Sequence, residues 1–424
     1  MRKVLYAVIT LLLLTLCICS ASAIADNRPY VDGGVYVDPY YFYNTTVRVV
    51  DGVVYTLYDG EQPHYEVVDF FATQELAKTV KTIRIAAEVD GVPVTAIRRG
   101  IANEEETREN YDRPTVYRFE ESYPQVKAIE LPKSVTTLGI GALRGLDGIE
   151  VLKLPESVTT LEEGALSGMK SLRTLVLPKT ITTLPRDLCR DNPMLSKVVL
   201  RGKVERIGMF AFQNCVRLTK IQLPDTPLTI DCQAFEHTGL KQLHIPAQTT
   251  LICGTDEEKP AHFANCSNLK KVVFENRPKA EKALYLSPYL FANCRALQKI
   301  TLPANSRSVV VQRGAFQNCT SLKTIKNTDR VTRLEKNALK SCKMLASFTL
   351  SKELDQIHKT AFSGCIGLKK LRVLATSPAF LKSGAAFLQN LSSTCKVYVK
   401  TANMKRAIVD AGCTGKVIVK ADLK

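Results

Sequence analysis

The chain has 424 residues, of which 45% are hydrophobic, and a formal net charge of +17 at pH 7. This hydrophobic share is ordinary for a globular protein and excludes a wholly disordered chain. The charge is unevenly divided: residues 24–130 carry 19 acidic and 11 basic side chains, whereas residues 131–424 carry 22 acidic and 45 basic ones. This contrast between an acidic N-terminal part and a basic remainder of the chain bears on binding partners and solubility rather than on the fold.

The first residues predict a signal peptide. Arg2 and Lys3 precede an apolar stretch over residues 4–18, and small residues suited to cleavage surround Ala23. The stretch is short for a membrane span and is followed by small and polar residues. We therefore expect residues 1–23 to be removed on export, the protein to be secreted or held at the cell surface, and the mature chain to have no transmembrane span.

A sequence repeat runs through residues 82–375. Its unit reads roughly L-P-x-S-V-T-x-L-x-x-x-A-F-x-x-C-x-x-L-x-x-I-x-L-P, and Pro132, Pro155 and Pro178 lie 23 residues apart. A period of this length is typical of a solenoid. One coil cannot bury its own apolar side, but stacked coils bury a continuous core that needs caps only at its ends.

Each part of the unit predicts a local structure. The phrase LxxIxLP alternates apolar and polar residues, as in a strand with one buried face, and proline then ends the strand. The phrase SVTxL is extended, and the spacing of about three residues around the cysteine favours a short helical or 3₁₀ return. We predict an α/β-type repeat solenoid dominated by short parallel strands, with about eleven units and capping segments at 24–81 and 376–424.

The repeated phrase resembles the BspA-type leucine-rich repeat of secreted and surface proteins, best known in bacteria of the mouth and gut. The likeness covers roughly residues 49–419. "VVDGVVYTLYDG" is similar to the opening unit of that family, and "CKVYVKTANMKRAIVDAG" is similar to its closing strand-and-helix cap. The resemblance implies a right-handed leucine-rich-repeat coil, and adhesion to host extracellular-matrix proteins or to other microbes.

Six cysteines occupy one position of the repeat. They are Cys215, Cys266, Cys294, Cys319, Cys342 and Cys365. Other units place Leu146, Met169, Asn192 or Thr238 there, and leucine cannot replace a metal ligand but can replace a small core residue. Side chains stacked in one column point the same way, which disfavours bridging. We expect reduced thiols that serve in packing, although whether any cysteine pairs stays open.

The sequence offers little for metal binding or catalysis. Cys253, His262 and Cys266 form one local Cys/His group, but a zinc site would need a fourth ligand and more regular spacing. The chain has no H-E-x-x-H, G-x-S-x-G or P-loop motif. We therefore expect no enzyme, no metal and no cofactor.

A basic stripe is the first candidate binding surface. The two residues before the first apolar position of the predicted strand are repeatedly cationic, and regular coils would stack them into one column. An acidic partner would fit it: a sulfated or uronic glycan, an acidic protein surface or anionic lipid. The alternative is that these side chains simply keep the array soluble. The basic stripe comprises Arg173, Lys197, Lys220, Lys241, Lys270, Lys271, Lys299, Lys323, Lys369 and Lys370.

The row of outward strand residues, the strand face, is the second candidate. Curved repeat arrays use such surfaces for extended partners, and its middle is partly apolar, as expected of a protein-binding strip. Exposed valines also suit strands without any partner. The strand face comprises Lys153, Val176, Val199, Gln222, His244, Val273, Thr301, Lys326, Thr349 and Arg372.

Three insertions depart from the period, at 103–122, 254–261 and 277–288. Long loops on rigid scaffolds are often functional, but tolerated insertions look the same in a sequence.

Together these features predict an exported, non-catalytic binding protein, a cell-surface adhesin or interaction scaffold that uses the strand face. The partner would be an extracellular-matrix protein or another cell-surface protein; nucleic acid is a poor partner for an exported chain. One alternative is an acidic-glycan-binding protein that uses the basic stripe, and another is a structural surface component without a discrete ligand.

Overall fold

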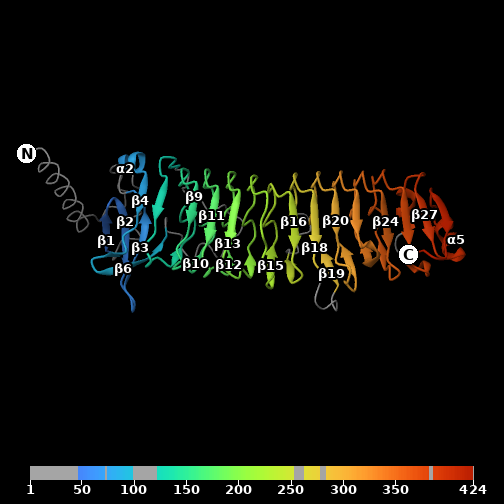
Figure 1. Ribbon diagram of the computed structural model, residues 1–424, viewed down its shortest axis with the longest axis horizontal. Coiled ribbons are helices and arrows are strands. Elements are labelled where there is room, and N and C mark those ends of the chain that lie inside the picture. Colours follow the sequence, from blue (N-terminus) through green and yellow to red (C-terminus); the bar gives the residue numbers. More distant parts are fainter. Residues whose placement is uncertain are drawn as a thin grey trace, which may run out of the picture.

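The computed structural model describes residues 46–71, 74–98, 122–252, 262–276, 283–381 and 385–423. The predicted signal peptide and the loop 254–261 lie outside these residues, as do nearly all of loop 103–122 and the part of the third loop over 277–282. The chain forms one elongated solenoid of about twelve turns, with little helix (Figure 1). Parallel strands dominate, as the repeat predicts.

Each coil has a first side, formed by the LxxIxLP phrase. Its strands pair in parallel with those of neighbouring coils, in the orders β4-β7, β9-β11-β13, β16-β18-β20-β22 and β24-β26-β27-β28. These strands are β4 (Thr82–Arg84), β7 (Ala128–Glu130), β9 (Val151–Lys153), β11 (Thr174–Leu177), β13 (Lys197–Leu200), β16 (Gln242–Ile245), β18 (Lys271–Phe274), β20 (Lys299–Thr301), β22 (Thr324–Lys326), β24 (Ser347–Leu350), β26 (Lys370–Val373), β27 (Lys396–Val399) and β28 (Lys416–Val419).

The second side of each coil is formed by the SVTxL phrase, after the proline has turned the chain. Its parallel orders are β6-β8-β10, β12-β14-β15-β17 and β19-β21-β23-β25. These strands are β6 (Val92–Ile97), β8 (Thr137–Leu138), β10 (Thr160–Leu161), β12 (Thr183–Leu184), β14 (Arg206–Ile207), β15 (Leu228–Asp231), β17 (Thr249–Ile252), β19 (Leu284–Leu286), β21 (Val309–Val311), β23 (Val331–Leu334) and β25 (Gln356–Ile357).

The third side of each coil, here called the return side, contains the residues around the repeat cysteine. It consists of turns rather than the short helices expected from the sequence. In most described coils two residues four apart have positive φ, such as Phe210 at 60° and Asn214 at 62°. A left-handed residue rotates its peptide out of the helical direction. Alternate N–H groups therefore bond to the next coil, as when Phe212 N donates to Ala234 O at 2.8 Å. The return is thus a third hydrogen-bonded side of the solenoid.

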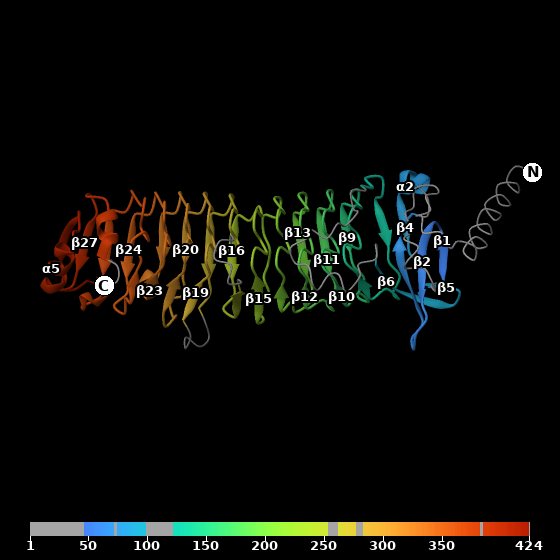
Figure 2. The ribbon, with the colours of Figure 1, turned by 180° about the vertical axis from the view of Figure 1, so that it is seen from behind.

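Different elements close the two ends (Figure 2). At the N-terminal end β1 (Val47–Val50), β2 (Val53–Tyr58) and β3 (His64–Asp69) form an antiparallel meander that joins β6, accompanied by α2 (Gln74–Thr79) and β5 (Glu88–Val89). At the C-terminal end α5 (Ala402–Asp410) packs against β27 and β28, with Met404 and Ile408 buried. The remaining elements are the 3₁₀ helices η2 (Thr328–Arg330), η3 (Pro378–Phe380) and η4 (Ala385–Asn390).

A row of stacked phenylalanines runs through the core. The ring centroids of successive coils lie 5.2 to 5.9 Å apart, and the rings are nearly parallel. Leucines such as Leu166 and Leu339 take the same position in other coils and are also buried. The stacked residues are Phe212, Phe235, Phe263, Phe291 and Phe316.

The six repeat-position cysteines are buried and free, which confirms the predicted reduced thiols. Each thiol also donates to a backbone carbonyl of the preceding coil, for example Cys319 Sγ to Phe291 O at 3.1 Å. Whether any cysteine pairs was open from the sequence, and Cys232 is disulfide-bonded. It follows β15 at a corner of the coil, outside the column in which side chains point the same way.

Candidate binding surfaces of the solenoid

The suspected Cys/His group is only partly within the described residues, because Cys253 lies outside them. His262 is buried, and its Nε2 lies 3.1 Å from Ile230 O. Burial lowers the pKa of His262 to about 4, against the carbonyls of Ile230 and Ile252, which favour the protonated ring. Cys266 Sγ donates to Phe235 O at 3.2 Å. Both side chains therefore have structural hydrogen-bond partners.

The strand face forms in-register rows on the first side of the solenoid. Val176 lies opposite Lys153 and Val199, and Val273 lies opposite His244 and Thr301. Two further pairs complete the rows, Thr301 with Lys326 and Thr349 with Arg372. Neighbouring parallel strands lie about 5 Å apart. The structure thus brings nine of the ten predicted residues onto strands of one surface.

Gln222 is the exception, because residues 218–224 form no strand ladder and separate β13 from β16. Its neighbours still alternate: Gln222 is exposed and Leu223 is buried. Burial of the leucine sets the direction of the side chains even without the ladder. The strand face is therefore continuous in side-chain direction but interrupted in hydrogen bonding.

The strand face also extends beyond the predicted residues into the C-terminal cap. Arg372 lies opposite Tyr398, and Tyr398 lies opposite Ile418. Both belong to short alternating stretches, KVYVK and KVIVK, which carry the strand signal without the Leu-Pro phrase. That alternation is the feature of the sequence that indicates these two positions.

The basic stripe lies two or three residues before the strand face along each coil. Arg173 Nε pairs with Glu150 at 3.3 Å. The other nine cations have no ion pair within the described part of the chain. Lys271 and Lys299 are direct cross-strand neighbours, so these like charges stand about 5 Å apart at their backbones.

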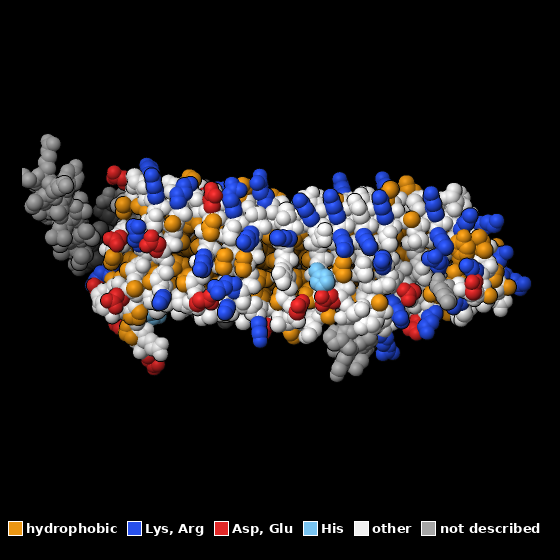
Figure 3. All heavy atoms as spheres, in the orientation of Figure 1, with side chains coloured by type: hydrophobic (Ala, Val, Ile, Leu, Met, Phe, Trp, Pro, Cys, Tyr) orange, Lys and Arg blue, Asp and Glu red, His pale blue; other side chains and the backbone are white. Residues whose placement is uncertain are grey.

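The stripe also continues into the cap, where Lys370, Lys396 and Lys416 are successive cross-strand neighbours. Lys370 Nζ lies 5.0 Å from the centre of the Tyr398 ring, a cation–π contact that joins the stripe to the strand face. Figure 3 shows Lys and Arg in rows along the long axis of this view, with hydrophobic side chains between the rows over β9–β13 and most Asp and Glu toward the lower edge. The arrangement provides a strip that is partly apolar and flanked by uncompensated positive charge.

Comparison with known proteins identifies the family. The BspA type leucine rich repeat region matches residues 115–188, 187–285 and 284–380, in six copies. The chain belongs to this family, which confirms the resemblance found in the sequence. Proteins with this repeat are typically not enzymes, and the family supports a role in protein interaction.

One solved structure shows the same fold, and two others are similar to a lesser degree. A leucine-rich repeat protein from Bacteroides ovatus is 19% identical, with a TM-score of 0.53 over 88% of this chain and 99% of that one. A leucine rich cell surface protein from Faecalibacterium prausnitzii is 17% identical, with a TM-score of 0.39 over 86% and 97%. The pneumococcal vaccine antigen PcpA is 15% identical, with a TM-score of 0.43 over 88% and 98%. Only the first of these scores is high enough to bear on the fold, and a search of curated proteins finds no match.

Among the described helices, none has the length and apolar character that crossing a membrane requires.

Proposed function

We propose that this protein is exported and acts at the cell surface, or in secreted form, as a non-catalytic adhesin or interaction scaffold. The strand face binds an extracellular protein, such as a host matrix protein. The observation that carries this proposal is the in-register row of Lys153, Val176 and Val199, one cationic and two apolar side chains on a rigid surface. Binding across such a surface needs little reorganisation, because hydrogen bonds join neighbouring coils along most of the three sides.

The test is binding of the mature chain to immobilised fibronectin and fibrinogen at low and physiological salt. Val176→Arg and Val273→Arg together should reduce binding at least tenfold, because two arginines would stand in the apolar part of the face. Val216→Arg is the matched control: Val216 is 52% exposed but lies on the return side. Binding that survives both face substitutions would contradict the proposal.

A second candidate is recognition of an acidic glycan by the basic stripe, favoured by its nine cations without an acidic partner. Reversal of Lys270, Lys271, Lys369 and Lys370 to glutamate should then abolish binding to heparin. Reversal of four return-side lysines makes the same change in net charge and is the control: Lys336, Lys340, Lys343 and Lys359. Equal losses in both variants would indicate attraction by net charge alone. Absence of binding to fibronectin, fibrinogen and heparin alike would favour a structural component without a discrete ligand.

A further inference from the structure

The second side of the solenoid is interrupted between β10 and β12 and again between β17 and β19, and the second interruption is lined by a pocket. Strands β17 and β19 occupy equivalent positions in adjacent coils, yet β17 pairs only with β15 and β19 only with β21 among the described residues. The same two coils stay joined on their other sides. On the first side β16 pairs with β18 over four residues, and on the return Asn265 N donates to Ala292 O at 2.8 Å.

The opening coincides with a difference in the lengths of the connections. β17 begins four residues after β16 ends, whereas β19 begins ten residues after β18 ends. The ladder stops between these two strands, whereas the coils remain stacked on their other sides. Because parallel strands direct their backbone groups alternately to both neighbours, the groups of β17 and β19 that face the gap have no strand partner among the described residues.

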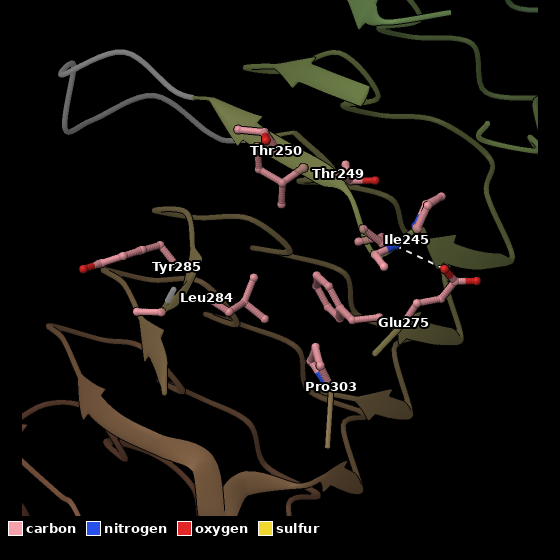
Figure 4. Close-up of a pocket in the computed structure, with 12 residues that line it drawn as sticks. Ile245, Thr249, Thr250, Glu275, Leu284, Tyr285 and Pro303 are labelled. Atoms are coloured by element: carbon pink, nitrogen blue, oxygen red, sulfur yellow. Dashed lines mark hydrogen bonds between the residues drawn. The ribbon is translucent and has the colours of Figure 1, made fainter. Parts of the chain in front are cut away.

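The gap is a pocket of about 530 Å³, within the range of ligand-binding sites. Figure 4 shows Thr249 and Thr250 of β17 on one wall and Leu284 and Tyr285 of β19 on another, with Glu275 at the rim. Ile245, Phe274 and Leu284 are buried and give an apolar lining, whereas Tyr285 is 58% exposed. Thr249 is 6% exposed, and its Oγ1 has no hydrogen-bond partner among the described residues.

Glu275 gives the pocket a negative rim on an otherwise basic body. One carboxylate oxygen bonds to His244 Nε2, and the other accepts from Ala247 N at 3.1 Å. These hydrogen bonds lower the pKa of Glu275, so the carboxylate stays ionised. About 37% of the side chain is exposed, which leaves it open to a cation from solution.

We propose that this gap binds an extended peptide segment of a partner protein by strand addition, with a lysine or arginine of the peptide beside Glu275. The peptide backbone pairs with the open edges of β17 and β19, and an apolar side chain facing inward packs on Phe274 and Leu284. Strand addition derives its affinity from main-chain hydrogen bonds and its specificity from pockets for alternate side chains. No strand-face residue lines the pocket, although His244 of the strand face bonds Glu275 at its rim.

Hydrogen exchange of the wild-type mature chain tests the site directly. Without ligand, amides of β17 and β19 should exchange faster than those of β15 and β21, which have neighbours on both sides. The probe is a positional-scanning library of acetylated hexapeptides. Its best binders should carry a basic residue next to alternating apolar residues, and should slow exchange in β17 and β19 at least tenfold.

Two controls separate strand addition from other binding. The same peptides with N-methylated backbone amides keep their side chains but lose hydrogen-bond donors, so they should bind at least tenfold more weakly. Glu275→Gln should weaken peptides with lysine several-fold without affecting versions with norleucine, whereas Glu353→Gln should change neither. Equal binding of N-methylated peptides, or a library that leaves exchange in β17 and β19 unchanged, would overturn the proposal.

Discussion

The cysteine that recurs in the repeat has a second role besides filling space. Its thiol donates to a carbonyl of the preceding coil, as Cys342 does to Phe316 O at 3.2 Å, and Asn192 makes the equivalent bond to Leu166 O at 2.8 Å. Both side chains stand in the same column, so the column favours a small side chain with a hydrogen-bond donor.

Burial raises the pKa of five of the six thiols, to about 12 for Cys365, which keeps those donors protonated at neutral pH. At Cys266, burial is outweighed by hydrogen bonds with Cys294 and Thr238, which lower the pKa.

Replacing Cys319 tests this role. Cys319→Ala removes the donor and leaves a small cavity, and it should cost about 1–2 kcal/mol of unfolding free energy. Cys319→Ser keeps a donor at the position and should cost less. Denaturant unfolding of the two variants, monitored by circular dichroism, gives the comparison. An alanine variant as stable as the wild type would show that the thiol serves only as filler.

His262 should make stability depend on pH. Its ordinary pKa is 6.5, and burial lowers it to about 4 in the folded chain. Between these values the unfolded chain binds a proton that the folded chain does not, so stability is full above pH 6.5 and falls as the pH drops toward 4. The total loss should be about 3 kcal/mol for that coil, from the size of the shift.

Thermal unfolding from pH 7.5 to 4.5 measures this effect. His262→Gln removes the titrating group and should flatten the acid side of the curve. His237→Gln is the control, because the side chain of His237 is 52% exposed. If both variants keep the slope of the wild type, another buried group causes the acid instability.

At the scale of elements, the phenylalanine stack holds the middle of the solenoid together. Phe291 packs between Phe263 and Phe316 at 5.6 and 5.9 Å and meets Phe274 edge-on. Phe291→Ala should cost about 3–5 kcal/mol. Phe291→Leu should cost less than about 1.5 kcal/mol, because leucine already fills this position in other coils. Calorimetry of both variants would settle the comparison, and similar losses for leucine and alanine would mean that the stacking of rings, rather than burial, stabilises the core.

The strands were predictable from the sequence because each coil buries one face of its strand, and the same alternation of apolar and polar residues recurs in every unit. The turns of the return side were not predictable, because they depend on residues with positive φ, and these interrupt the short helix that the spacing indicates. Gly141 and Gly164 hint at left-handed turns, but Phe210 and Tyr289 adopt positive φ with side chains that give no such signal. The pocket was also beyond prediction, since it lies between two coils whose connections differ in length and whose strands form no ladder there.

At the scale of the molecule, the continuous stacking turns scattered lysines into columns. Cross-strand register makes Lys271 a neighbour of Lys299, and Lys396 a neighbour of both Lys370 and Lys416. The sequence could indicate that these positions are cationic, but only the register shows which cations are adjacent. The described strands of the N-terminal meander lie at the opposite end of the rod from the lysines of the cap (Figure 1).

This arrangement predicts that salt stabilises the protein. Unit charges 5 Å apart repel by about 0.8 kcal/mol in water, and 0.1 M salt screens a substantial part of that over a Debye length of about 10 Å. Exposed ion pairs such as Arg48–Asp90 respond in the opposite direction but contribute little each. With a net charge of +17 the repulsion should prevail, so the unfolding midpoint should rise as NaCl increases from 10 to 200 mM.

Lys299→Gln combined with Lys396→Gln removes one charge from each of the three adjacent lysine pairs and should weaken this salt response. Lys336→Gln combined with Lys405→Gln removes the same charge from other surfaces and should leave most of the response in place. Differential scanning fluorimetry across the salt series compares the two variants with the wild type. Equal responses in the two variants would assign the effect to net charge, whereas a loss confined to the first variant would show that the lysine columns carry a repulsion that an acidic ligand would relieve.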